Sequence, residues 1–444
     1  MYSELRLGTN LALFDTSASY AQLRRIVVSG DIDDTWRYEI GDIDLSWTPY
    51  TIWNYGSEGN VRESELFAQW RALQDYENFS ESNDWRLKGA KFEGLWTKGD
   101  SSVVKVSNFI SRIKASDEIT RPEVLMGGVE IEFSRPKIGL GMRVQDFAVL
   151  GNTIPDGLNA NVAALGADFS YSGSSLSIRG EAGGSFSSSV AEPSPPFSGS
   201  ANNIRGGFWN IQSSTSWSEK WRASLEAHSV SDTYIAPASQ SKRIRFDQAP
   251  SSFAQVNNDN WSRNLSQGDI LSSSYQPRGN RPWNQLVQRE LMPYDARYGT
   301  ATPYGKATPN RRGISVSIAR GDNQDTWSFE MASSVLQDLT PEGVNNRRNY
   351  VCSDAMGQCT LSSLWNGERK LKVNGGWRIQ HVNRDGTIFE AVSLKSQLLD
   401  LGGTWEVMES LSLLYGVKLI RAVGTEYLAQ RDADFSITDF DQVA

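Results

Sequence analysis

The stretch 165-LGADFSYSGSSLSIRGEAGGSF-186 decides the fold of this chain. Every second residue from Leu165 to Tyr171 is apolar, and the residues between them are small or polar, as in a strand with two unlike faces. The four residues SGSS at 172–175 have the composition of a tight turn. The same alternation then restarts at Leu176 and continues to Phe186. The stretch therefore predicts a β-hairpin with one apolar and one polar face.

The same pattern recurs along the chain. Apolar residues alternate with polar ones around turns at 218–220, 322–323 and 383–386. In these stretches the period is two and not the 3.6 of a helix. We predict about sixteen strands, at about 4–14, 21–30, 35–47, 85–97, 102–113, 123–133, 138–150, 160–171, 176–187, 204–217, 221–235, 311–320, 326–338, 369–382, 387–407 and 411–430.

The connections between these strands differ in length in a regular way. One side of the predicted sheet carries only short turns, at 31–34, 98–101, 134–137, 172–175, 218–220, 321–325 and 383–386. The other side carries longer segments, at 48–84, 114–122, 151–159, 188–203, 236–310 and 339–368, with short connections only at 15–20 and 408–410. The turn at 408–410 breaks the rule, so either the last hairpin has a short external turn or the long run 387–407 has to be divided into two strands.

Short turns on one side of the sheet, long loops on the other and strands with one apolar face are typical of a membrane-spanning barrel. In a β-sandwich nothing requires the short and long connections to lie on opposite sides. We therefore predict an all-β fold in which residues 1–444 form a single domain, an antiparallel up-and-down transmembrane β-barrel with long loops on one side. The chain shows about sixteen of its strands, with the barrel either complete or continued beyond them.

The composition agrees with this prediction and excludes other classes. No run approaches about 18 consecutive apolar residues, which excludes a membrane-spanning helix. The chain has 15 Trp and 15 Tyr, residues that favour membrane interfaces. A soluble lectin-like protein would also be rich in aromatic residues. The net charge of -8 argues against nucleic acid as a partner.

Aromatic residues open four of the predicted strands just after short turns. They are Trp36, Trp221, Trp327 and Phe389. In a membrane barrel these positions would form an aromatic girdle at one interface. The alternative is that strand starts simply favour aromatic residues.

If the apolar faces meet lipid, the polar faces point into a lumen. The candidates for lining it are Glu130, Glu132, Arg143, Arg179, Glu181, Arg222, Glu226, Glu330, Lys372 and Arg378. Mixed charges of this kind could line a water-filled passage. They could equally pair across the lumen into a lattice that closes it.

Two long connections could do more than join strands. Within 48–84, Leu66, Trp70 and Leu73 recur at helical spacing, which predicts a short amphipathic helix in 61–77. This helix could narrow or plug the barrel, or merely cap the loop. The segment 236–310 is rich in Ser, Asn, Gln, Pro and Arg. It is either an external contact surface for a ligand or a solvated loop.

The cysteines and histidines indicate no metal, no cofactor and no catalytic centre. Cys352 and Cys359 are the only cysteines and fall in the predicted loop 339–368, where they could form a local disulfide or remain unrelated thiols. Two thiolates alone do not complete a tetrahedral metal site. His228 is on the predicted lumen face and His381 on the apolar face, and no nucleophile elbow, zinc motif or phosphate loop is present. We therefore expect no enzyme activity.

In these features the chain resembles the bacterial outer-membrane β-barrel proteins, especially porin-like barrels with large external loops. The resemblance rests on architecture over nearly the whole chain and not on a signature motif. It implies a place in the bacterial outer membrane, lipid as a partner, and a role as a passive pore for small solutes or as a surface scaffold. Residues 1–4, MYSE, lead straight into the strand pattern, and the final DQVA lacks the terminal aromatic of such barrels, so we expect a fragment. The alternative is a secreted, soluble all-β protein that binds carbohydrate.

Overall fold

The protein is described here from a computed structural model, which shows a single antiparallel sheet of eighteen strands. The structure describes the chain except for residues 10–18, 54–63, 70–86, 191–200 and 240–300, a few shorter gaps in connections, and single residues. Each strand pairs with its neighbours in sequence. The strands are β1 Tyr2–Thr9, β2 Ser19–Ile32, β3 Trp36–Ile43, β4 Leu87–Lys98, β5 Ser102–Lys114, β6 Glu123–Ser134, β7 Ile138–Leu150, β8 Asn159–Ser172, β9 Leu176–Val190, β10 Ala201–Ser216, β11 Trp221–Val230, β12 Arg311–Arg320, β13 Trp327–Gln337, β14 Asn349–Thr360, β15 Leu371–Arg384, β16 Val392–Met408, β17 Leu411–Leu428 and β18 Arg431–Val443.

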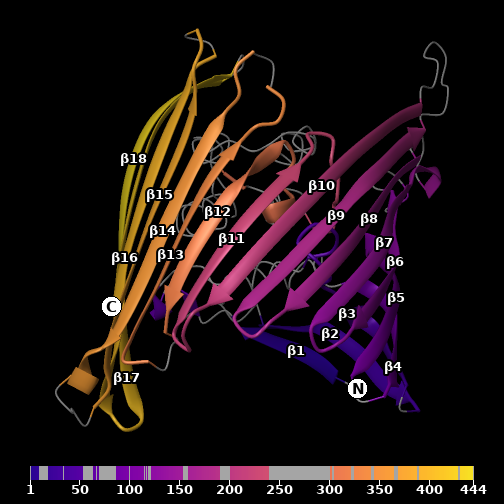
Figure 1. Ribbon diagram of the computed structural model, residues 1–444, viewed down its shortest axis with the longest axis horizontal. Coiled ribbons are helices and arrows are strands. Elements are labelled where there is room, and N and C mark those ends of the chain that lie inside the picture. The colour runs from indigo at the N-terminus through magenta and orange to yellow at the C-terminus, as the bar shows by residue number, and fades with distance from the viewer. Residues whose placement is uncertain are drawn as a thin grey trace.

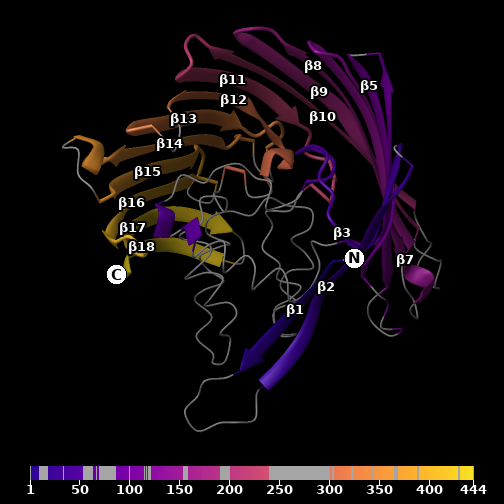
Figure 2. The same cartoon turned by 90° about the horizontal axis from the view of Figure 1, so that it is seen from below.

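The sheet is strongly curved (Figure 1). Seen from below, it follows a wide arc from β2 and β3 round to β18, and segments of the chain lie inside that arc (Figure 2). Among the strand registers that the structure describes, none joins β1 to β18, so the sheet is open. The arc defines a convex face and a concave face. Short 3-10 turns at Gly151–Thr153, Gly305–Ala307 and Leu361–Leu364 interrupt the connections.

The prediction of an antiparallel all-β fold is confirmed. Each of the sixteen predicted strands overlaps a strand of the sheet, and the sheet contains two further strands that the sequence did not predict. β14 lies inside the segment 339–368 that the sequence marked as a loop, and β18 follows the last predicted strand. In the described parts of the chain no helix is long and apolar enough to cross a membrane.

The additional strand β14 also corrects the assignment of turns to the two edges of the sheet. Every connection from an even-numbered to an odd-numbered strand falls on one edge, and these run from the two residues 409–410 to the ten residues 361–370. The turn 409–410 therefore belongs to the short-turn edge, and the turn after β15, which begins at Asp385, moves to the other edge. The opposite edge carries 44–86 and 231–310, with 429–430 as its shortest connection.

The two cysteines both lie on β14 and are free thiols, so the predicted disulfide is wrong. Cys352 pairs in register with Ser334 and Cys359 with Trp327. Seven residues of extended chain separate them, or roughly 23 Å, whereas the Cα atoms of a disulfide lie within about 7 Å. The odd spacing also places the two thiols on opposite faces of the sheet.

The polarity of the two faces is the reverse of that in a soluble protein. Large apolar side chains on the convex face are open to the surroundings, with Met142 68%, Val335 60% and Ile314 54% exposed. The concave face carries buried polar and charged side chains, among them Glu130 and Arg143, each 3% exposed. Soluble proteins seldom expose an apolar patch of more than a few hundred Å². The convex face therefore exposes large apolar side chains that soluble proteins seldom expose together.

Three apolar clusters on the concave side attach the inner segments to the sheet. One joins Ile43, Leu45 and Ile52 to side chains of β4, β5 and β6. A second joins Tyr50, Tyr234 and Ala307 to Phe208 and Val230. The third contains Ala301, Leu336, Tyr350, Val382 and Val392. The segments 44–53, 231–239 and 301–310 are thus packed against the inner wall, where they narrow the space inside the arc.

Candidate functional site

The ten residues predicted to line a lumen all fall on the concave face of the sheet. Residues separated by an even number of positions on a strand point to the same face. Each of the ten is related in this way to a buried, inward-facing residue of its own strand, as Arg378 is to Gln380 and Glu330 is to Leu336. The register places two of them directly opposite each other, because Glu130 pairs with Arg143, and it places Glu181 opposite the polar side chain of Asn210. The charged residues of the sequence pattern therefore form a connected inner surface.

Arg143 is the centre of a buried ion-pair network on β6 to β9. Its Nε donates to Glu130 Oε1 over 3.1 Å, and its Nη1 lies 2.6 Å from Asp168 Oδ1 and 3.8 Å from Glu181 Oε1. Its side chain is 1% exposed. Several carboxylates thus share one guanidinium, an arrangement that holds neighbouring strands in a fixed relation.

An inner segment covers this network and hydrogen-bonds to it. Thr48 Oγ1 donates to Glu181 Oε1 over 2.6 Å, and Gln145 Nε2 donates to the carbonyl of Thr51 over 2.9 Å. Local sequence gave no signal for this contact, because Thr48 and Glu181 are 133 residues apart. The buried carboxylates receive hydrogen bonds here that water would otherwise supply.

Two buried tyrosines connect this inner segment to β10. Tyr50 stacks on Phe208 with ring centroids 4.6 Å apart, its hydroxyl accepts a hydrogen bond from Asn210, and the hydroxyl of Tyr234 donates to the carbonyl of Tyr50. Burial raises the pKa of both tyrosines well above their usual range. Both therefore remain protonated in the folded protein at pH values where an unfolded chain begins to lose these protons.

This difference predicts loss of stability at alkaline pH. Above pH about 10 the unfolded chain binds fewer protons than the folded one, so the free energy of unfolding falls as pH rises, by up to about 1.4 kcal/mol per pH unit for each tyrosine. In thermal unfolding measured between pH 8 and 11, the stability of the Tyr50→Phe/Tyr234→Phe variant should fall less steeply with rising pH than that of the wild-type protein. The same change at Tyr171, which is exposed on the convex face, is the control. If the double variant loses stability with rising pH as steeply as the wild-type protein, the loss does not come from these two tyrosines.

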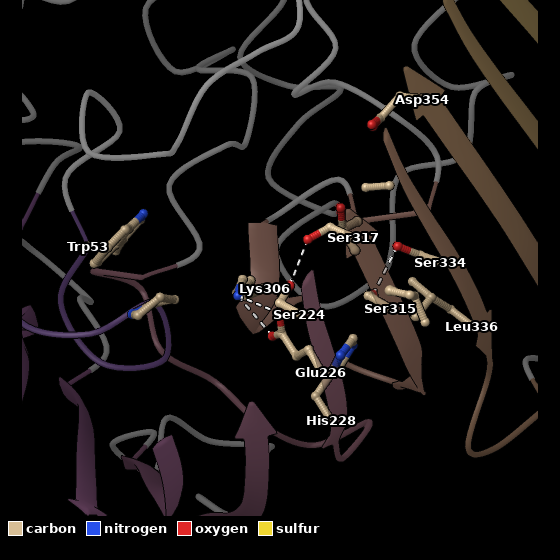
Figure 3. Close-up of a pocket in the computed structure, with 14 residues that line it drawn as sticks. Trp53, Ser224, Glu226, His228, Lys306, Ser315, Ser317, Ser334, Leu336 and Asp354 are labelled. Carbon is tan, nitrogen blue, oxygen red and sulfur yellow. Dashed lines mark hydrogen bonds and ion pairs between the residues drawn. The ribbon is translucent and has the colours of Figure 1, made fainter. Parts of the chain in front are cut away.

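A half-open cavity of about 360 Å³ lies next to this cluster, between the inner segments and β11 to β14. Three adjacent rows of the sheet register form its wall. The first row contains Ser224, Ser317, Ala332 and Asp354, the second Glu226, Ser315 and Ser334, and the third His228 and Leu336. Figure 3 shows these side chains on one side of the cavity and Trp53 on the other. Thr302, Pro49 and Lys306 complete the lining contributed by the inner segments.

Hydrogen bonds organise the polar wall of this cavity. The hydroxyls of Ser224 and Ser317 lie 2.7 Å apart, and that of Ser315 donates to Ser334 over 2.9 Å (Figure 3). Lys306 Nζ donates to both carboxylate oxygens of Glu226, each over 2.8 Å. Glu226 was among the predicted lumen residues, whereas Lys306 was missed, because no local pattern marks a residue that contacts a strand 80 positions away.

The short helix predicted for 61–77 is described only in part. Glu65, Leu66, Ala68 and Gln69 have helical backbone, and the amide of Ala68 donates to the carbonyl of Ser64. The remaining residues of the predicted helix lie outside the described part of the chain. The described turn lies within the arc beside β16 and β17 (Figure 2).

This helical turn is attached to the inner wall far from its own strands. The amide of Ser64 donates to Asp400 Oδ2 over 3.0 Å, and Thr404 Oγ1 donates to Glu65 over 2.9 Å. Lys418 Nζ lies 3.9 Å from the same oxygen of Asp400. The connection that begins after β3 therefore crosses the concave side to reach β16.

Gly402 makes this attachment possible, and its replacement should weaken it. A Cβ at this position would lie 2.6 Å from Cβ of Ser64 and 2.9 Å from the carbonyl of Tyr415. We expect Gly402→Ala to lower the free energy of unfolding by about 1 kcal/mol. Gly357→Ala is the control, because its Cβ would meet only the carbonyl of Ser328 at 3.9 Å, and it should be neutral or slightly stabilising. Equal effects of the two changes in chemical unfolding would count against the attachment.

Three of the four predicted girdle positions lie near the short-turn edge, whereas the fourth, Phe389, belongs to the connection between β15 and β16 on the opposite edge. Trp36, Trp221 and Trp327 are the first residues of β3, β11 and β13, and Phe389 lies outside the described residues. The structure adds partners that the sequence did not single out. Trp96 meets Trp36 edge to face at 5.1 Å, and Trp217 stacks on Trp221 at 5.8 Å. An aromatic band thus follows this edge of the sheet.

No protein-family model matches the chain, and no curated protein matches it. No group of three or more possible metal-binding side chains occurs among the residues whose positions are described. Most of the segment predicted as an external contact surface, 240–300 within 236–310, also lies outside them.

Proposed function

We propose that this chain forms a β-barrel in the bacterial outer membrane, with the convex face in lipid and the concave face lining a passage for small polar solutes. One observation carries the proposal. Large apolar side chains are open on the convex face, while charged and hydroxyl side chains are gathered on the concave face. Only an apolar solvent outside and a polar space inside satisfy both faces.

The lengths of strands and connections support the same proposal. A membrane-crossing strand needs about 9–11 residues, and most strands here have between ten and eighteen. The aromatic band near the short-turn edge would lie at the periplasmic interface, and the long connections would face outward. Closure of the barrel belongs to the proposal. Edge strands with unpaired amides and carbonyls are costly in lipid, so the edges of β1 and β18 would be paired there.

The inner segments suggest a narrowed passage rather than a wide one. Residues 44–53 and 231–239 are held on the wall by Thr48, Tyr50 and Tyr234. The charge network around Arg143 lies beneath them and is buried. The solute route would then run along the half-open cavity beside β11 to β14 and not along the covered wall of β6 to β9.

Reconstitution in planar lipid bilayers tests this proposal. The detergent-solubilised full chain should produce stepwise conductance, and it should run differently on gels before and after boiling, as a stable barrel does. A folded protein that stays monomeric in buffer without detergent would overturn the proposal. It would favour a soluble binding protein, against which the exposed convex face argues.

A further inference from the structure

The cavity beside β11 to β14 contains an arrangement that a passage alone does not require. His228 borders it and is only 5% exposed, yet neither ring nitrogen has a hydrogen-bond partner among the residues the structure describes. A buried polar group without a partner costs about 1–3 kcal/mol. A neutral imidazole has one donor and one acceptor to offer. Such a group indicates a ligand that brings both.

The charged groups of the cavity are already engaged within the protein. Lys306 and Glu226 form a bidentate pair, and Asn210 Nδ2 also donates to Glu226 over 2.5 Å. Asp354 also has a partner of its own. A charged ligand would have to separate these pairs or face an uncompensated carboxylate. The cavity therefore has no strong preference for an ion.

The groups that remain are neutral. Ser224, Ser317, Ser315 and Ser334 each carry a hydroxyl that can donate one hydrogen bond and accept two, so each pair retains capacity after its mutual hydrogen bond. Trp53 lies across the cavity from this serine wall (Figure 3). An indole ring has a large apolar face and a polar edge. Hydroxyl groups on one side and an aromatic face on the other suit a ring that carries both hydroxyls and C–H groups.

We propose that this cavity is a binding subsite for a neutral saccharide. This inference rests on the proposed passage of small polar solutes and names their chemical class. The volume of about 360 Å³ is within the range of small-molecule sites, about 300–1,000 Å³. The serine rows and His228 would hydrogen-bond the sugar hydroxyls, and Trp53 would pack against the face of the ring.

Equilibrium dialysis of radiolabelled maltose against the full chain in detergent tests the subsite without requiring transport. Glucuronate and glucosamine serve as charged sugars that keep the same pyranose ring. We expect saturable maltose binding that glucose displaces and that the two charged sugars displace at least tenfold less well. Absence of maltose binding, or tighter binding of glucuronate, would overturn the proposal.

Matched serine variants locate the site. Ser317→Ala removes a hydroxyl from the cavity wall, and we expect it to weaken maltose binding about 2- to 10-fold, the value of one hydrogen bond. Ser214→Ala is the control, because Ser214 lies in the same register row and bonds to Ser177 over 2.6 Å but does not line the cavity. His228→Leu should weaken binding tenfold or more, with gel mobility before and after boiling used to check folding. Equal losses in Ser317→Ala and Ser214→Ala would overturn the assignment.

The two proposals fail separately. Conductance in bilayers without maltose binding would overturn the saccharide subsite and leave the passage in place. Site-dependent maltose binding without any conductance would overturn the passage and leave the subsite as that of a receptor. Reduction of the current by maltose in wild type, and less reduction in Ser317→Ala, would support both.

Discussion

Leu225→Arg should impair assembly of the protein in membranes by about 2–4 kcal/mol, the cost of a lipid-facing arginine near the middle of a bilayer. Leu225 is on β11 and is 51% exposed on the convex face, and its register partner Val316 is 50% exposed. If this face meets lipid, the guanidinium must be transferred out of water into hydrocarbon. The change should therefore reduce the fraction of protein that resists unfolding on unboiled gels after folding into lipid vesicles.

Ser224→Arg is the depth-matched control for this prediction. Ser224 is adjacent to Leu225 on the same strand but faces the concave side, where it borders the 360 Å³ cavity with room for a longer side chain. It lies two residues from the carboxylate of Glu226 on the same face. We expect its effect on assembly to be small. Equal impairment by the two arginines would show that the convex face does not meet lipid.

Arg143→Met should lower the free energy of unfolding by about 3–5 kcal/mol, because it leaves buried carboxylates without their shared cation. Glu130, Asp168 and Glu181 all lie within 3.8 Å of the guanidinium nitrogens. Methionine has a similar length and keeps the apolar part of the packing. The loss of stability in Arg143→Met therefore measures the contribution of the guanidinium charge and its hydrogen bonds.

Chemical unfolding with two companion variants checks this prediction. Arg37→Met is the control, because Arg37 is 60% exposed, and the nearest oxygen of Glu39 is 3.9 Å away, a pair worth at most about 1 kcal/mol. Adding Glu130→Gln to Arg143→Met should recover part of the loss, since it removes one of the stranded charges. Additive losses in the double variant would mean that the two residues do not interact.

Strands with one clearly apolar face could be predicted from the sequence, whereas a strand in which neither face is clearly apolar could not. In β14 the inward residues include Tyr350, Cys352 and Asp354, and the outward ones include Val351 and Cys359, so neither face stands out by a period of two. Pairing with β13 and β15 along its length specifies this strand instead. β18, with the sequence RDADFSITDFDQV, carries five charged residues in thirteen, which obscure the short apolar alternation at its centre, and it is absent from the predicted strands.

In the candidate site, the sequence predicted the residues on the strands but not those on the inner segments. Residues such as Glu181 and Glu226 were found because strand parity alone assigns a side chain to a face. Thr48, Tyr50 and Lys306 were not found, because their contacts depend on how inner segments fold back over the wall. The predicted disulfide is wrong because the segment 339–368 contains the extended strand β14, whereas in a loop two cysteines seven residues apart could meet.

The strand count has a consequence for how the sheet could close. With an even number of strands, β1 and β18 run in opposite directions, so a pairing between them would be antiparallel like every other pair in the sheet. An odd count would have forced one parallel pair at the seam, with a different hydrogen-bond geometry. The start of β1 and the end of β18 also lie at the same edge of the sheet, the one that carries the short turns. A seam formed there would be continuous with the rest of the wall.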